Sequence, residues 1–239
     1  VQCIPPLGRD AGEVFVFQRT PSSIDVRNNH EIDADWFATL PPGWSREWLV
    51  NFATLQTGGF ADEDLVKDGW TDIAQRIRDR VLANAANGEV LDLAAFHRAY
   101  EDSDDEKMDE IRARVDELVE DAAAAEALKA WYRQLCKRPC FHDEYLQAFN
   151  RPNVTLIDCP AGIERITERG PVVGGQQYEV DGHASGTGFE AELTPLPRRI
   201  GHDIVGRGGT SLAEKWADGA ASLFGMMSRG FPNMFVMPA

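Results

Sequence analysis

A long central block with helical spacing, enclosed by strands on both sides, constrains the fold of this chain most strongly. From about Asp33 to Leu135, apolar residues recur at the three- and four-residue intervals of amphipathic helices. A short run of β-branched and aromatic residues, Val14 to Phe17, precedes the block, and two similar runs, NVTLID and IERITERG, follow it. This pattern predicts an α/β fold that is interrupted by an inserted helical region.

Breaks of turn-forming residues divide the sequence into shorter elements. Pro-Pro, Gly-Gly and Asp-rich breaks separate five helical segments: SREWLVNFATLQ, TDIAQRIRDRVLANA, DLAAFHRAY, KMDEIRARVDELV and AAAAEALKAWYRQL. After them we predict a strand at QQYEVDG, with turns at Gly170 and Gly174-Gly175, and a last strand at MFVMPA. VGRGGTSL lacks the lysine of a phosphate-binding loop, so we interpret it as a tight turn, with a capping box of Ser211 and Glu214 after it.

Charge and hydropathy argue against several classes of partner. The formal net charge is -15, which argues against a nucleic-acid or anionic-membrane partner. Residues 101–126 hold 12 acidic and 3 basic residues, and we interpret this run as a solvated helix face. No apolar run is long enough to span a bilayer and no signal-peptide pattern opens the sequence, so we expect a cytoplasmic protein. Because the sequence starts at Val1 rather than Met, we expect a piece of a longer protein.

A cluster of cysteines, a histidine and two cations follows the helical block. Cys136, Cys140 and His142 have the spacing C-x3-C-x-H, without the second ligand pair that a structural zinc site needs. Their spacing also differs from the C-x-x-C of redox motifs. We therefore interpret these cysteines, together with Cys3 and Cys159, as free thiols.

Two places along the sequence are candidates for binding an anion. Lys137 and Arg138 lie where the helical block meets the returning α/β region, and ligands often bind at such junctions. The two cations could equally pair with Asp143 or Glu144. Arg19 follows the first strand, where a dinucleotide-binding unit can hold a 2′-phosphate, but without a preceding glycine loop an exposed arginine is the simpler interpretation. Spacing alone leaves both places open.

Several stretches resemble, in the right order, the class B flavin monooxygenases of the Baeyer-Villiger type. They are VFQRTP, KRPCFHDEYLQAFNRPNVTLID, GIERITERG, GTGFE, and LAEKWADG with RGFPNMFVMPA. The resemblance covers nearly the whole chain. Its most specific part is the Lys-Arg pair followed by YLQAFNRPNV, and GTGFE looks like the family's Ala-Thr-Gly-Phe element near the flavin.

The resemblance implies part of a flavoprotein with two Rossmann-like dinucleotide-binding domains, one for FAD and one for NADPH. Residues 1–30 and 136–175 would belong to the NADP-binding domain, residues 31–135 to a helical insertion in it, and residues 176–239 to the FAD-binding domain. The family's glycine-rich cofactor motifs and its F-x-G-x-x-x-H signature would lie upstream of this sequence. We therefore expect the chain alone to be inactive.

The resemblance also implies roles for single residues. Arg19 and Thr20 match the residues that hold the NADP 2′-phosphate, with Lys137 beside them. Arg138 matches the active-site arginine that, in the family, stabilises the negatively charged oxygenated flavin and positions the nicotinamide. A permanently charged guanidinium suits that role, because it can stabilise a developing anion in a water-poor pocket. Three residues of the GTGFE element would lie near FAD: Gly186, Thr187 and Gly188.

The implied reaction inserts one oxygen atom of O2 next to a ketone carbonyl, giving an ester or a lactone, with the redox chemistry supplied by FAD and NADPH. One alternative is a related flavin monooxygenase that oxidises nitrogen or sulfur. Another is a non-catalytic interaction module built on the acidic helices, which would need an apolar stripe left over after core packing. We expect the core to consume the one stripe present, formed by Ile111, Val115, Leu118 and Val119. The sequence specifies neither the ketone nor the oligomeric state.

Overall fold

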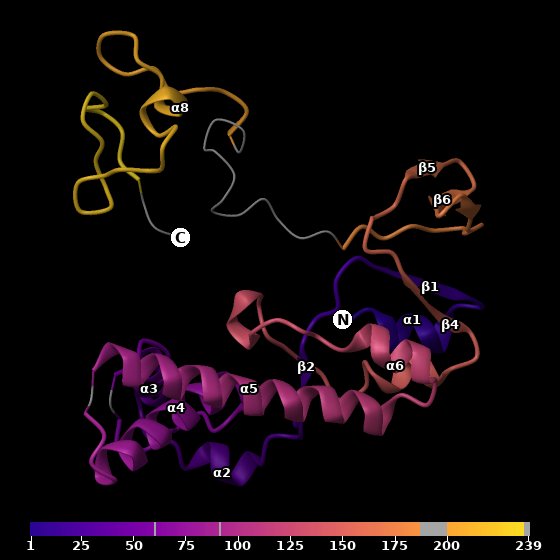
Figure 1. Ribbon diagram of the computed structural model, residues 1–239, viewed down its shortest axis with the longest axis horizontal. Helices are drawn as coiled ribbons and strands as arrows, with labels where there is room; N and C mark the ends of the chain where they lie inside the picture. The colour runs from indigo at the N-terminus through magenta and orange to yellow at the C-terminus, as the bar shows by residue number, and fades with distance from the viewer. Residues whose placement is uncertain (60, 91, 187–199, 237–239) are drawn as a thin grey trace. The chain divides into compact units, whose positions relative to one another are not determined.

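The computed structural model describes residues 1–59, 61–90, 92–186 and 200–236 (Figure 1). The chain divides into two compact units, Val1–Asp181 and Gly182–Ala239. The helices of the first unit are α1 (Ile4–Asp10), α2 (Ala34–Ala38), α3 (Trp44–Gln56), α4 (Gly69–Ala86), α5 (Leu93–Leu118) and α6 (Ala122–Leu128), with the 3-10 helices η1 (Gln134–Cys136) and η2 (Gln147–Asn150). Its strands are β1 (Val14–Gln18), β2 (Ile24–Asp25), β3 (Cys140–Phe141), β4 (Val154–Asp158), β5 (Arg165–Thr167), β6 (Gly170–Val173) and β7 (Gln176–Gln177). The second unit contains α8 (Leu212–Lys215).

The strands β1 and β4 pair in parallel, although almost the whole first unit separates them in sequence. Their register runs from Val14 opposite Val154 to Gln18 opposite Asp158. The predicted strands at Val14 to Phe17 and in NVTLID are therefore confirmed. Because the pair is parallel, the carboxyl ends of both strands lie at the same edge.

A second parallel pair, β2 with β3, marks where the chain enters and leaves the helical region. Ile24 lies opposite Cys140, and Asp25 opposite Phe141. All five helices from α2 to α6 lie between these two strands in sequence, and in Figure 1 α5 is the long helix that runs from the α3–α4 end of the unit towards α6. The predicted interruption of the α/β region by helices is confirmed.

Aspartate side chains begin most of these helices. Asp33, Asp68, Asp92 and Asp121 each precede a helix, and each accepts a hydrogen bond from backbone N–H groups of its first turn. Such a cap is worth about 1 kcal/mol, because it satisfies a donor that has no partner within the helix. The acidic composition of the block therefore contributes directly to where its helices start.

Two predicted helix boundaries are wrong. The Asp-rich stretch after Tyr100 is not a break, because α5 continues through it to Leu118. Side chains on this stretch have partners that hold the helix together: Arg80 pairs with Glu106, and the Asp104 carboxylate accepts from the backbone N–H of Gln134 at 2.9 Å. The acidic run is consequently not a uniformly solvated face, since Asp104 is buried.

The last predicted helix of the block is also shorter than its sequence suggests. It ends at Leu128 rather than at Leu135, and Lys129 is extended. Tertiary contacts of Tyr132 with residues 21 and 23 hold the following segment outside a helix, which overrides local helix propensity.

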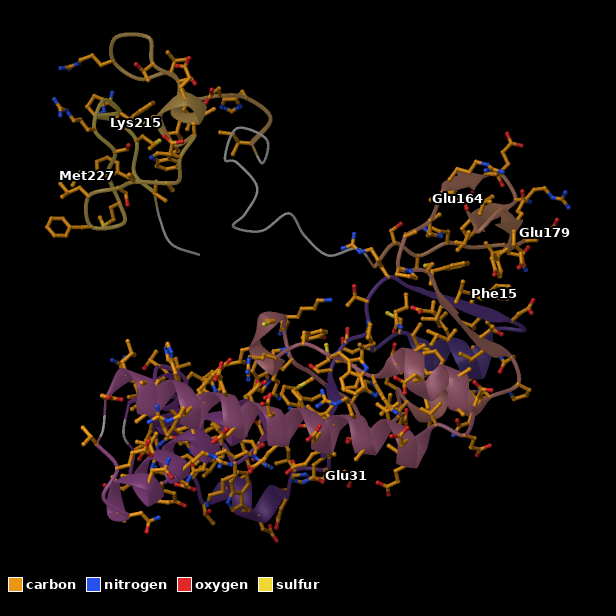
Figure 2. All side chains as sticks on the ribbon, viewed as in Figure 1. Phe15, Glu31, Glu164, Glu179, Lys215 and Met227 are labelled. Carbon is orange, nitrogen blue, oxygen red and sulfur yellow. The ribbon has the colours of Figure 1, made fainter. Side chains whose placement is uncertain are left out.

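The segment after β4 forms an antiparallel meander of β5, β6 and β7. The predicted strands in IERITERG and QQYEVDG correspond to β5 and the short β7, whereas β6 was not predicted. Gly174 and Gly175 form the expected turn, with φ of +57° and +77°, values that favour glycine. Tyr178 joins the meander to β1, because its ring contacts Phe15 and Phe17 edge-on with both centroids 5.2 Å away (Phe15 is labelled in Figure 2).

In the second unit, Ser211 and Glu214 form the predicted capping box at the start of α8. The glycine-rich segment before it makes a turn, in which the backbone N–H of Gly206 donates to Thr210. The strand predicted in MFVMPA is not formed over residues 234–236, and its remaining residues lie outside the described part of the chain. No helix among the described residues is long and apolar enough to cross a membrane.

The main core lies between α5, α6 and the β1–β4 pair. Its buried members are Val14, Ile24, Val115, Val119, Ala125, Leu128, Tyr145, Leu146, Phe149 and Val154. Ile111 is buried in a second, smaller cluster, and Leu118 packs at the edge of the first. The apolar stripe of α5 is thus used inside the unit, as expected.

A buried lysine joins the helical block to β2. Nζ of Lys107 on α5 lies 2.7 Å from Oδ2 of Asp25 and 3.0 Å from Oδ2 of Asp72 on α4. The side chains of Lys107 and Asp25 are only 9% and 11% exposed. Nearby, the Arg114 guanidinium donates to the carbonyls of Ile24 and His142, both at 3.1 Å. Together, Lys107 and Arg114 fix α5 to the two strands through which the chain enters and leaves.

The charges of this cluster support one another over the neutral pH range. Burial lowers the pKa of Lys107, but hydrogen bonds and charges from Asp25 and Asp72 outweigh burial and raise it. Burial raises the pKa of Asp72, but Lys107 and Arg76 outweigh burial and lower it. The Asp72 contribution to stability is therefore present above about pH 3.9 and is lost as the pH falls through the folded-state pKa. The Lys107 contribution is complete below about pH 10.4 and is lost as the pH rises through its folded-state pKa.

We predict that Lys107→Met lowers the free energy of unfolding by about 3–5 kcal/mol, because it leaves the Asp25 carboxylate buried without its cation. Urea denaturation of the 239-residue chain, followed by circular dichroism, measures this. Lys67→Met is the matched control, since Lys67 pairs with Glu63 at 2.8 Å on the surface with its side chain 66% exposed, and its loss should have little effect. Equal effects of the two changes would contradict the proposed importance of the Lys107 cluster.

Candidate functional site

The carboxyl edge of the β1–β4 pair carries the first predicted site residues. Arg19 and Thr20 follow β1 directly and are exposed, and Asp158 ends β4 in register with Gln18. In open α/β sheets, ligands bind in the crevice outside the carboxyl ends of the strands. The structure therefore places Arg19 and Thr20 at the edge where a ligand is expected.

An open cavity of about 760 Å³ lies at this edge. It is lined by residues from both strand ends and from the segment around α6: Arg19, Thr20, Pro21, Ala123, Glu126, Ala127, Lys129, Trp131, Tyr132, Asp158 and Pro160. Lys129 is already engaged, with Asp116 and Glu126 both at 2.9 Å from its Nζ. Arg19 has no carboxylate within 4.0 Å among the described residues, so its charge is available to a ligand.

Tyr132 connects this cavity to Lys137. Its hydroxyl donates to the carbonyl of Pro21 and accepts from the backbone N–H of Ser23, both at 3.0 Å. On the same side chain, Nζ of Lys137 lies 4.7 Å from the centre of the ring, within the range of a cation–π interaction. Tyr132 thus lines the same cavity as Arg19 and Thr20, and its ring contacts Lys137, which is not itself among the lining residues.

Arg138 lies in different surroundings from Lys137, although the two are consecutive. Its guanidinium carbon is 5.8 Å from the ring centre of Trp70, in the first turn of α4. Trp70 in turn contacts Phe141 on β3, with ring centroids 5.1 Å apart. The helical block therefore supplies an aromatic surface on which the exposed Arg138 rests.

The acidic residues that could have neutralised Lys137 and Arg138 are occupied elsewhere. The Asp143 carboxylate accepts hydrogen bonds from the backbone N–H groups of residues 27, 28 and 29, all at 3.0 Å. Burial raises the pKa of Asp143, but these backbone hydrogen bonds outweigh burial and lower it. Glu144 pairs with Arg9 at 3.2 Å. The ion-pair interpretation of the two cations is therefore wrong for these partners.

The electrostatic pattern of the site is unusual for so acidic a chain. Within Val1–Asp181, most arginines and lysines lie within 4.0 Å of a carboxylate, for example Arg76 with Glu110 at 2.7 Å. Arg19, Lys137 and Arg138 have no such carboxylate among the residues that the structure describes, and nor do Arg46, Arg114 and Arg151, of which the last two donate to backbone carbonyls instead. With a net charge of -15, three cations that keep their charge uncompensated are suited to binding anions.

The cysteines and the histidine near Arg138 form a different arrangement. Cys136 is exposed, and Sγ of the partly buried Cys140 lies 3.7 Å from the carbonyl of Arg138. Nδ1 of His142 accepts from the backbone N–H of Glu144 at 3.1 Å. Among the described residues, no group of three or more histidines, cysteines or acidic residues could hold a metal ion.

The element predicted to lie near FAD belongs to the second unit. Gly186 is exposed, and a Cβ at this position would meet no atom within 4 Å. Packing within the chain therefore does not require glycine at position 186. Thr187 and Gly188 lie outside the described residues.

No family model matches the chain, but curated proteins do. Neopentalenolactone D synthase of Streptomyces avermitilis is 46% identical over 99% of this chain and 40% of its own length. A Baeyer-Villiger monooxygenase of Streptomyces coelicolor is 47% identical over 98% of this chain and 39% of its own length. The FAD-binding monooxygenase hmp7 of Hypomyces subiculosus is 40% identical over 99% of this chain and 39% of its own length. The chain spans about two fifths of the length of these relatives.

Over nearly its whole length the chain is homologous to proteins named Baeyer-Villiger monooxygenases.

Solved structures agree with this homology. The polycyclic ketone monooxygenase from the thermophilic fungus Thermothelomyces thermophila matches with a TM-score of 0.77 and 35% identity, over 100% of this chain and 39% of that protein. An oxidised steroid monooxygenase bound to NADP matches with a TM-score of 0.66 and 26% identity, over 98% of this chain and 45% of that protein. The predicted fold class, α/β and part of a flavoprotein with two dinucleotide-binding domains and a helical insertion, is confirmed.

Sequence reasoning missed two aromatic residues that contact the candidate cations: Tyr132 beside Lys137 and Trp70 beside Arg138. Tyr132 was assigned to a helix, and Trp70 precedes the predicted start of its helix. No periodicity indicates their roles, because both act through contacts with residues distant in sequence. The one signal available was the aromatic pair Trp131-Tyr132 shortly before the two cations.

We predict that Gly69→Ala destabilises the contact between Trp70 and Phe141. A Cβ on Gly69 would collide with Cε1 of Phe141, so the ring must move, at a cost of about 1–3 kcal/mol. Thermal unfolding and tryptophan fluorescence of the chain measure the effect. Gly12→Ala is the control, because a Cβ there meets nothing within 4 Å, and an equal loss of stability in both variants would contradict the prediction.

Proposed function

We propose that this chain is the part of a Baeyer-Villiger monooxygenase that binds the 2′-phosphate of NADPH and places an arginine at the reacting centre. The whole protein would convert a ketone, O2, NADPH and a proton into an ester or lactone, NADP+ and water. The observation that carries this proposal is that Arg19 and Thr20 line the cavity at the carboxyl edge of β1 together with Tyr132, whose ring contacts Lys137. Neither Arg19 nor Lys137 has a carboxylate within 4.0 Å among the described residues.

The 2′-phosphate fits the residues at this edge. A phosphate monoester carries a charge of about -1.5 to -2 at neutral pH and accepts several hydrogen bonds. Arg19 offers a fork of donors, Thr20 a hydroxyl, and Lys137 a compact point charge. Because these groups are exposed or beside a cavity, a phosphate can reach them without displacing an internal ion pair.

Arg138 is proposed to act on the reacting atoms. Its guanidinium keeps its charge at all relevant pH values and donates up to five hydrogen bonds. Resting on Trp70, it is held by an aromatic ring rather than by an acid, so its charge is not neutralised in advance. A cation of this kind can stabilise negative charge that develops during oxygen transfer and can orient the nicotinamide.

We infer the cofactors from the relatives. One is named an FAD-binding monooxygenase and one structure contains NADP. When bound, NADPH supplies two electrons and FAD activates O2.

We propose that residues 1–30 and 136–175 form part of the NADP-binding domain around the insertion 31–135. Residues 176–239 would form part of the FAD-binding domain, with Gly186, Thr187 and Gly188 near the flavin. A chain of this extent would need the remaining length of its relatives to be active, and NADPH dependence favours a cytoplasmic location.

Two other functions are less well supported. Oxidation of nitrogen or sulfur would also use FAD and NADPH, but the relatives named for their reaction type are Baeyer-Villiger monooxygenases. A non-catalytic interaction module would need a free apolar stripe on α5, whereas Ile111, Val115 and Val119 are buried in the unit. A small ketone and O2 are therefore the proposed partners.

We predict that Arg19→Ala raises the KM for NADPH by about 10- to 100-fold, as expected for losing hydrogen bonds to a charged group. The KM for NADH, which lacks the 2′-phosphate, should stay the same. The measurement is anaerobic flavin reduction in the protein that carries this chain together with the rest of its relatives' length. Arg165→Ala, which removes an exposed cation of β5, is the control, and an equal effect on both cofactors would argue against a 2′-phosphate site.

We predict that Arg138→Ala lowers kcat for ester formation by about 100- to 1,000-fold, the typical loss for one donor to a developing anion. Flavin should remain bound. Product formation from a ketone, measured with Arg46→Ala as a control for an exposed cation on α3, tests this. Unchanged ester formation would remove Arg138 from the mechanism, and absence of bound flavin from the wild-type protein would reject the proposed function.

A further inference from the structure

We propose that Tyr132 is the positioning residue that sets the preference for NADPH over NADH. This inference rests on the proposed 2′-phosphate site and adds to it a residue that does not itself carry charge. Tyr132 comes from the segment after α6, whereas Arg19 and Thr20 come from the segment between β1 and β2. The preference for NADPH over NADH would thus depend on one side chain that joins these two segments.

The hydroxyl of Tyr132 fixes the turn that carries the phosphate-binding residues. It bonds to Pro21 and Ser23, which lie 111 and 109 residues earlier in the sequence. Ser23 is 2% exposed, so loss of the hydroxyl would leave its backbone N–H buried without this partner. Because Pro21 follows Thr20 directly, movement of this turn would displace Arg19 and Thr20 from the edge of the cavity.

The ring of Tyr132 seats the second cation. Nζ of Lys137 lies 4.7 Å from its centre, and no described carboxylate competes for that ammonium within 4.0 Å. Burial raises the pKa of Tyr132 and outweighs the hydrogen bond from Ser23, which lowers it. The hydroxyl therefore keeps the proton that it donates to Pro21, and the ring stays uncharged beneath the ammonium.

The backbone on both sides of Tyr132 is anchored to α5. The carbonyl of Ala130 accepts from Nη1 of Arg112 at 3.1 Å, and the backbone N–H of Gln134 donates to Asp104 at 2.9 Å. Arg133 also lies 3.4 Å from Asp104. The tyrosine is therefore presented from a fixed segment, so a change in its hydroxyl should alter the turn rather than its own position.

The test compares Tyr132→Phe, Tyr132→Leu and wild type in the flavin-bound protein that carries this chain together with the rest of its relatives' length. Tyr132→Phe keeps the ring and removes the hydroxyl, and we expect the KM for NADPH to rise about tenfold, as for the loss of one buried hydrogen-bond partner. The KM for NADH and kcat at saturating NADPH should stay unchanged. Tyr178→Phe is the matched control, since the Tyr178 hydroxyl makes no hydrogen bond to the described residues.

A double-mutant cycle with Lys137→Met tests the second contact. Coupling between positions 132 and 137 should be present for Tyr132→Leu and absent for Tyr132→Phe, which retains the ring beneath Lys137. Lys137 is exposed, so Lys137→Met should not affect folding, and thermal unfolding checks each variant. A merely structural role would move the KM values for NADPH and NADH together.

The outcomes separate this inference from the proposed function. A lower NADPH preference in Tyr132→Phe, with wild-type NADH kinetics, supports it. An unchanged preference in a wild-type enzyme that does favour NADPH overturns the role of Tyr132 and leaves the proposed function standing. A wild-type enzyme whose flavin is not reduced by NADPH overturns both.

Discussion

The buried charge of Lys107 is the interaction on which the arrangement of the first unit depends. An ammonium that is almost without solvent must be matched, and Asp25 and Asp72 match it from β2 and from α4. Because one of these acids belongs to the α/β region and the other to the helical block, the cluster determines how the two are joined. Arg114 adds hydrogen bonds to the backbone on both sides of the same junction. Close to this connection, Trp70 near Asp72 on α4 packs against Phe141, which lies opposite Asp25 in the β2–β3 pair.

The candidate site has a local positive charge because its cations lack carboxylate partners, not because it contains many cations. The chain has far more acidic than basic residues, so chance pairing would neutralise most arginines and lysines. At the site, aromatic rings take the place of carboxylates beneath Lys137 and Arg138. A ring holds a cation with a modest energy and leaves its charge available, whereas a carboxylate would compete with a bound phosphate.

Much of the fold could be predicted from the sequence, because the strands β1 and β4 and the helices α3 and α4 show clear periodicity. The continuity of α5 could not, since the acidic side chains that suggested a break are held by partners such as Arg80 and Gln134 from other segments. The end of α6 was missed for a similar reason, because Tyr132 is held by a segment more than 100 residues away. Resemblance pointed to Arg19, Lys137 and Arg138, but the aromatic residues beneath the two later cations follow only from tertiary contacts.

The adjacency of β2 and β3 has a consequence for how this part of the protein can vary. The entropy cost of closing a loop grows slowly with its length, by about 0.6 kcal/mol for each doubling. Since Lys107 and Arg114 of α5, together with the start of α4, fix the block to the strand pair, the segments from α2 to α3 can gain or lose residues with little effect on that pair. Insertions and deletions should therefore be tolerated in the segments away from the strand pair, whereas the position of Lys107 on α5 opposite Asp25 is constrained.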